Sequence, residues 1–144
     1  MGNAISYEDY LNTHGSLTYS NVGVSMLPLL REGKDLFIVR KKGPGRCRTG
    51  DVVLYRRPPD HYVLHRIIRV RPNDYVVLGD NCIKREYGIR DEDIIGVMTG
   101  FVRNGREHST EEAGYRVYSA LWLCTAPVRI CLKKALLRLR RMKP

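Results

Sequence analysis

The stretch YVLHRIIRV, residues 62–70, combines β-branched and aromatic residues with a single histidine. Successive side chains of an extended chain alternate between two faces, which places Val63, His65 and Ile67 on the same face. Similar short runs, each bounded by turn residues, occur on both sides of it: LTYSNVGV (17–24), DLFIVRK (35–41), DVVLYR (51–56), DYVVLG (74–79) and DIIGVMTGFVR (93–103). Six short strands at this spacing predict a mainly β fold, as an antiparallel barrel or as packed sheets.

Helical patterns flank this β region at both ends. Residues 6–13 predict a short helix with Ser6 as its cap. Beyond Gly105 the apolar spacing changes to that of a helix, and Pro127 interrupts the pattern. We therefore expect three parts, which are an N-terminal helical arm (1–16), a β domain (17–105) and a basic amphipathic helical tail (106–144).

The charge of the 144-residue chain is unevenly distributed. The formal net charge is +10, but residues 129–144 hold seven Lys or Arg and no acid, whereas residues 1–128 hold all 15 acids and 18 bases. Because the body is close to neutral, we expect no nucleic-acid partner. No apolar run is long enough to span a bilayer, and the N-terminal residues lack the apolar segment of a secretory signal.

The tail predicts two apolar helical faces separated by Pro127. The first comprises Tyr115, Tyr118, Leu121 and Trp122, and the second comprises Cys131, Leu132, Ala135, Leu136 and Leu139. The basic face opposite the second comprises Arg129, Lys133, Lys134, Arg138, Arg140 and Arg141. Such a helix is typical of peripheral contact with an anionic membrane surface, here through residues 115–141. The alternative is a helix packed on the β domain with a solvated basic face, in a cytoplasmic protein.

The four cysteines are predicted to be free thiols. They stand far apart, without the CxxC spacing that zinc sites use: Cys47, Cys82, Cys124 and Cys131. We expect neither a metal nor a cofactor.

The segment GVSMLPLL, residues 23–30, contains a candidate nucleophile. A strand that ends at Val24 would leave Ser25 at a strand-to-turn junction, where converging backbone amides can hold an oxyanion. Gly23 permits close approach of a substrate backbone, and Pro28 favours the start of a helical turn. A serine before a turn is also a common helix cap, so the segment alone does not identify a nucleophile.

His65 is the candidate base, because an imidazole can take the proton of a serine hydroxyl at neutral pH. A hydrogen-bonded core histidine is the alternative. Asp80 and Glu86 are both acids of the kind that orients such a histidine. Asp80 lies in the sequence Gly79-Asp80-Asn81, which also has the composition of a hairpin turn.

Taken in order, five blocks resemble the type I signal peptidase family, and within it the endoplasmic-reticulum-type branch: GVSMLPLL (23–30), GDVVLY (50–55), VLHRII (63–68), LGDN (78–81) and DIIGVM (93–98). The resemblance covers about residues 19–103 and implies a signal-peptidase-like β core. It also implies Ser25 as nucleophile, His65 as general base, and a substrate-binding and oxyanion motif formed by Gly23, Ser25, Met26 and Pro28. The third catalytic residue remains open between Asp80 and Glu86.

The activity implied by the resemblance is that of a serine endopeptidase. Its substrate would be a precursor from which a signal or leader peptide is cleaved after small residues (Ala-x-Ala). Since no N-terminal membrane span is found, a specialised peptidase acting on a leader peptide or a membrane-proximal precursor fits best. The alternatives are a non-catalytic peptide-binding or membrane-surface module, and a self-cleaving repressor-type peptidase. A histidine base predicts that activity declines as the pH falls through 6–7.

Overall fold

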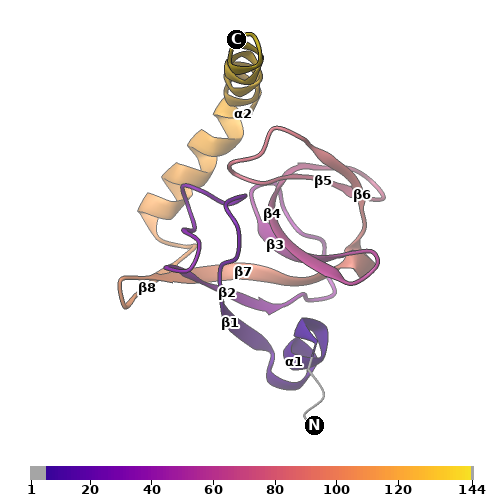
Figure 1. The fold of residues 1–144 in the computed structure, drawn as a ribbon. Helices are drawn as coiled ribbons and strands as arrows, with labels where there is room; N and C mark the ends of the chain where they lie inside the picture. Colours follow the sequence, from indigo (N-terminus) through magenta and orange to yellow (C-terminus); the bar gives the residue numbers. More distant parts are fainter. Residues whose placement is uncertain (1–5, 144) are drawn as a thin grey trace.

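The computed structural model describes residues 6–143, which contain eight strands and two α-helices (Figure 1). The N-terminal elements are α1 (Tyr7–His14), β1 (Ser16–Ser20) and β2 (Leu36–Lys41). The central elements are β3 (Val52–Arg57), β4 (His61–Val70), β5 (Tyr75–Leu78) and β6 (Glu86–Ile89). A 3-10 turn (Asp91–Asp93) leads to β7 (Ile94–Arg103), β8 (Arg106–Ser109) and the long helix α2 (Ala113–Arg141).

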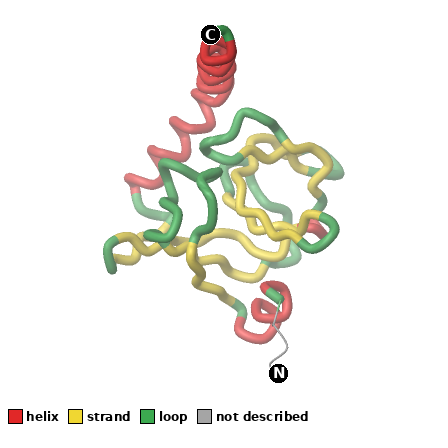
Figure 2. The backbone as a smooth tube through the Cα atoms, viewed as in Figure 1, coloured by secondary structure: helices red, strands yellow, loops and turns green. Residues whose placement is uncertain are grey.

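The strands form one antiparallel sheet in the order β1-β2-β7-β3-β4-β5-β6, and β8 pairs with β7. Figure 2 shows β3 to β6 curving round into a ring, while β1, β2 and β7 extend from it. Central strands are therefore buried on both faces, and all four residues of β5 are buried. The prediction of a mainly β, antiparallel core with a helix at each end is confirmed, and its strands form one continuous curled sheet.

Helix α1 has a capping residue at each end. The Ser6 hydroxyl accepts a hydrogen bond from the amide of Asp9 at 3.1 Å, as predicted for an N-terminal cap. Gly15 ends the helix with a φ of +80°, in the left-handed region that favours glycine, and its amide donates to the Leu11 carbonyl. Leu11 is buried in the main core, so α1 closes one end of the sheet. Residues 1–5 of the predicted N-terminal arm lie outside the described residues.

The first strand is shorter than predicted. It ends at Ser20 and not at Val24. Beyond it the Asn21 backbone amide still donates to the Asp35 carbonyl at 3.1 Å, while its side-chain amide donates to the Leu30 carbonyl at 3.2 Å and ties the following loop to the body. The positive φ of Gly23, +82°, then turns the chain. Ser25 consequently starts a series of turns that follows a loop, and is not at a strand end.

Two strands were not predicted. β6 pairs with β5, but its exposed residues and central Gly88 hide the alternation that marks a strand. β8 pairs with β7 beyond Gly105, so the helical part of the tail begins at Ala113.

The prediction that Pro127 interrupts the tail is wrong, since α2 is one helix of 29 residues. Proline removes one backbone hydrogen bond from a helix interior. Packing on both sides of Pro127 offsets this loss. Ala126 and Ile130 are buried against Leu78, and the Arg129 guanidinium donates to the Trp122 carbonyl at 2.6 Å.

The two predicted apolar faces of the tail are only partly buried. Tyr115 and Tyr118 pack against the main core, but Leu121 is exposed. The second face points away from the body, with Leu132, Leu136 and Leu139 all exposed. None of the helices in residues 6–143 combines the length and apolar character needed to cross a membrane.

Candidate active site

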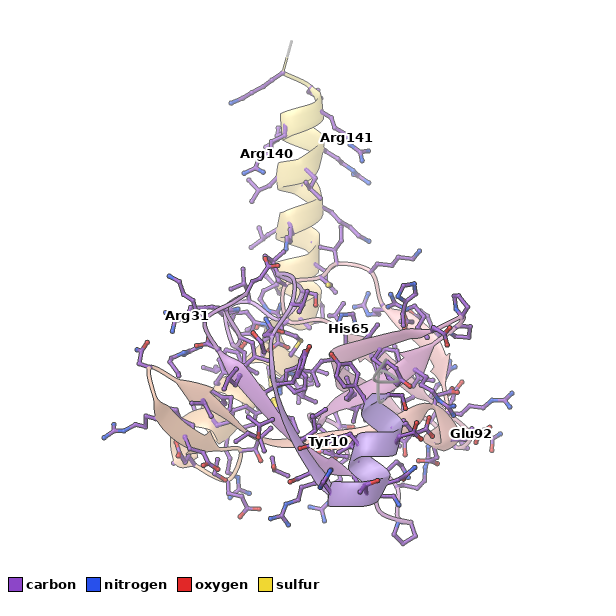
Figure 3. All side chains as sticks on the ribbon, turned by 60° about the horizontal axis from the view of Figure 1, so that its bottom comes forward. Tyr10, Arg31, His65, Glu92, Arg140 and Arg141 are labelled. Atoms are coloured by element: carbon purple, nitrogen blue, oxygen red, sulfur yellow. The ribbon has the colours of Figure 1, made fainter. Side chains whose placement is uncertain are left out.

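His65 lies in the middle of β4 and points in among the strands of the sheet (Figure 3). The residue is 8% exposed and lines an open pocket of about 920 Å³. Ser25 lines the same pocket from the turn region that follows β1. The remaining lining comes from the loop after β1, from β3, β4, the segment 81–86 and α2. Its residues are Asn21, Val22, Arg57, Tyr62, Val63, Leu64, Asn81, Cys82, Ile83, Lys84, Arg85, Glu86, Lys133 and Leu137. The fold thus brings together two residues that stand 40 positions apart in the chain.

Gly79 lies where Ser25, His65 and Cys82 converge. A Cβ added to Gly79 would stand 2.8 Å from the Ser25 carbonyl oxygen, 3.0 Å from His65 Nε2 and 2.6 Å from Cys82 Sγ. Only glycine fits at this point without a shift of its neighbours. His65 Nε2 and the Ser25 carbonyl oxygen therefore both lie beside Gly79, although no hydrogen bond joins the Ser25 hydroxyl to the imidazole in the described residues. Such bonds are often long in a free enzyme and shorten when substrate binds.

The other imidazole nitrogen is held by a tyrosine and an acid. The Tyr55 hydroxyl donates to Glu86 Oε2 at 2.6 Å and lies 3.3 Å from His65 Nδ1. Because the only hydroxyl proton of Tyr55 is directed to Glu86, Nδ1 must carry the proton shared with Tyr55. This tautomer leaves a free lone pair on Nε2. Arg57 binds the second oxygen of the same carboxylate.

Burial sets the protonation of these groups. Desolvation lowers the pKa of His65 to about 4, so the imidazole is neutral at pH 7. Burial, with the hydrogen bond to Glu86, raises the pKa of Tyr55 above its usual value, which keeps the hydroxyl protonated. A neutral histidine with an open Nε2 is the form that a general base requires.

Asp80, the other predicted acid, lies elsewhere. Its carboxylate accepts two hydrogen bonds from Arg66, from Nε at 2.8 Å and from Nη2 at 2.9 Å, and a third from the Tyr118 hydroxyl at 2.8 Å. Arg66 follows His65 on β4, so its side chain is on the opposite face of the strand. Asp80 thus pairs with Arg66 under α2, and of the two acids only Glu86 is connected to His65, through Tyr55.

The backbone near Ser25 has free donors. Within residues 6–143, the amides of Gly23 and Ser25 donate to no backbone carbonyl. Unpaired amides of this kind are suited to holding an oxyanion. Of the four residues of the predicted motif only Ser25 lines the pocket: Gly23 lies just outside the lining, Met26 is buried in the core beneath the turn, and Pro28 is exposed. Met26 therefore supports the turn from below, where the sequence had suggested a substrate contact.

Helix α2 supports the loop that carries Ser25. Asn81 donates from its amide to the Ser25 carbonyl at 2.8 Å and from its side chain to the Val24 carbonyl at 3.0 Å. Lys133 of α2 in turn binds the backbone and side-chain oxygens of Asn81. The Trp122 indole donates to the Asp80 carbonyl at 2.8 Å. The first half of the tail is therefore packed on the β domain, as one of the two predicted alternatives had it, and α2 forms part of the wall of the pocket.

Sequence reasoning missed Tyr55, Arg57 and Cys82. The signal for Tyr55 lies in the hairpin register, where Arg57 pairs with His61 and Val53 with His65. Tyr55 then lies diagonal to His65 on the same face, within reach of its ring. Cys82 comes close to His65 only through the conformation of the loop after β5, which no sequence pattern indicates.

All four cysteines are free thiols. The part of the chain that the structure describes contains no group of three His, Cys, Asp or Glu side chains placed to hold a metal.

The fold and the pocket define a mainly β protein with a serine and a buried histidine at one site. Compared with known proteins, the chain matches no family model, no curated protein and no solved structure.

Proposed function

We propose that the protein is a serine endopeptidase of the signal-peptidase type, in which Ser25 is the nucleophile and His65 the general base. The observation that carries this proposal is the shared pocket, which Ser25 and His65 both line, with His65 Nε2 and the Ser25 carbonyl beside Gly79 and with Nδ1 held by Tyr55. The resemblance of the five sequence blocks to signal peptidases supports the same pair and suggests precursors with small residues before the cut.

The proposed reaction uses these groups in two steps. Ser25 Oγ attacks the peptide carbonyl as His65 Nε2 takes its proton, and the same proton then passes to the leaving amine. Water hydrolyses the resulting acyl ester with His65 again as base. The hydrogen-bonded pair Tyr55–Glu86 keeps the imidazole in the reactive tautomer and supports the imidazolium that forms. The amides of Gly23 and Ser25 would hold the oxyanion.

Cys82 is the competing nucleophile, because its sulfur also lies near His65 Nε2. Burial raises the pKa of the Cys82 thiol, which disfavours the thiolate on which cysteine reactivity depends. A hydroxyl activated by a neighbouring base needs no such ionisation in advance. The electrostatics of the pocket therefore favour Ser25.

The proposal is tested with a pool of precursor peptides that vary at the two small-residue positions of an Ala-x-Ala segment. We expect wild-type protein to cleave members with small residues at both positions, and His65→Ala to cleave none. Mass spectrometry of the products identifies the bond. Cleavage of no member by the wild type above the rate of His65→Ala would contradict the proposal and favour a non-catalytic peptide-binding module.

The pH profile of kcat/KM distinguishes the base. Since protonated His65 cannot accept the serine proton, activity falls as the pH falls through the pKa of the free enzyme. Burial moves this decline from the range 6–7, expected for a solvated histidine, towards a pKa of about 4. We expect a flat profile between about pH 6 and 8, with circular dichroism confirming the fold at each acidic point. A profile still rising above pH 9 would assign the base to a lysine, of which Lys84 and Lys133 line the pocket.

A further inference from the structure

Helix α2 carries an apolar stripe that faces solvent, here called the outer stripe. Its members are exposed by 57–61%: Val117, Leu121, Val128, Leu132, Leu136 and Leu139. Their spacing of three, four or seven residues keeps them on one face of the helix. A contiguous exposed apolar surface of this kind marks a site of interaction.

The outer stripe is on the side of α2 opposite the body. Ile130 is 5% exposed where α2 packs on Leu78, whereas Val128 and Leu132 are 61% and 60% exposed. Two residues along an α-helix correspond to a rotation of about 200°, so neighbours two positions away face the other way. The body therefore cannot cover the stripe without releasing the contacts that hold α2 in place.

The charge around the outer stripe indicates the chemistry of its partner. The 29 residues of α2 contain no acid. At about 100° per residue, Lys134 and Arg138 border one side of the stripe and Arg140 borders the other. Figure 3 shows Arg140 and Arg141 near the far end of α2, well beyond the sheet. Long basic side chains on both sides of an apolar stripe match an anionic lipid surface, whose headgroups they reach while the stripe enters the interface.

We propose that α2 lies along an anionic membrane surface with the outer stripe inserted at the headgroup boundary. This docking does not depend on the proposed peptidase activity. It has a geometric consequence for the pocket, because Lys133 and Leu137 line the pocket from the body-facing side of the same helix. The pocket would then be separated from the lipid by one helix diameter, about 10 Å.

Flotation with lipid vesicles tests the docking. We expect the full chain to float with vesicles of phosphatidylcholine and phosphatidylglycerol and to bind vesicles of phosphatidylcholine alone far more weakly. Leu132→Gln/Leu136→Gln removes two members of the stripe while keeping good helix formers, and we expect binding to weaken by more than about tenfold. Lys134→Gln/Arg138→Gln should weaken binding to the anionic vesicles by about 30-fold, since each base near such a surface contributes about fivefold.

The matched control is Tyr87→Gln, which removes an equally exposed apolar side chain from β6 and should leave binding unchanged. Circular dichroism checks that each variant keeps its helix content. Equal binding of wild type and Leu132→Gln/Leu136→Gln would overturn the proposal. A second result would also overturn it: wild-type protein that does not float with vesicles but forms a dimer in sedimentation equilibrium. If Leu132→Gln/Leu136→Gln disrupted that dimer, the outer stripe would pair two copies of the chain.

Discussion

Replacing Ser25 with alanine is expected to reduce kcat/KM for precursor cleavage by on the order of 10⁴-fold or more, with little change in stability. The loss is large because the nucleophile and base act as a unit, and the remaining oxyanion donors and binding contacts supply only the residual rate. Ser25 is half-buried and its hydroxyl makes no hydrogen bond within residues 6–143, so the fold does not depend on it. The measurement is the initial rate of cleavage, with the midpoint of urea unfolding determined in parallel.

The matched control is Cys82→Ala, in the same pocket. We expect it to retain most of the activity, because the raised pKa of the thiol keeps sulfur unreactive. The opposite result, with Ser25→Ala active and Cys82→Ala inactive, would make the protein a cysteine peptidase. Activity in both variants would show that neither side chain is the nucleophile.

Replacing Asp80 with alanine is expected to lower the free energy of unfolding by about 3–5 kcal/mol, because it leaves the buried Arg66 guanidinium without its counter-charge. Both side chains are 1% exposed. The Tyr118 hydroxyl loses its acceptor in the same change. For a chain of this length the loss corresponds to a fall in Tm of about 10 °C, measured by circular dichroism.

Asp74→Ala is the control for this prediction, because it removes an acid from an ion pair with Arg71 at the surface. Exposed pairs contribute little to stability, so the change in Tm should be much smaller. Equal shifts for the two variants would contradict a structural role for Asp80. A second measurement separates stability from chemistry. Well below its Tm, Asp80→Ala should keep the flat activity profile between about pH 6 and 8, since loss of the Asp80 charge can only lower the pKa of His65 further.

The sequence was sufficient for the parts of the site that lie within one strand or turn. Alternation along residues 62–70 predicted that His65 faces inward with Val63 and Ile67. In the structure Ile67 is buried in a core cluster and Val63 packs against the same cluster. The same alternation placed the Arg66 side chain on the opposite face of the strand from His65. The choice between Asp80 and Glu86 was left open because it depends on which face of β4 each loop covers. The curvature of β3 to β6 brings Glu86 to Tyr55, whereas α2 covers Asp80 and Arg66.

The sequence by itself determined the β periodicity, the cap at Ser6 and the basic tail, because these features depend on side-chain order over a few residues. It indicated Ser25 and His65 as a candidate pair only through the order of five blocks along residues 19–103. Only the tertiary structure decided that β1 ends at Ser20, that α2 continues through Pro127, and that the predicted apolar face of the tail points outward. Each of these outcomes depends on contacts between residues distant in the chain. Packing energy gained across the whole interface outweighs the local preference of any single residue.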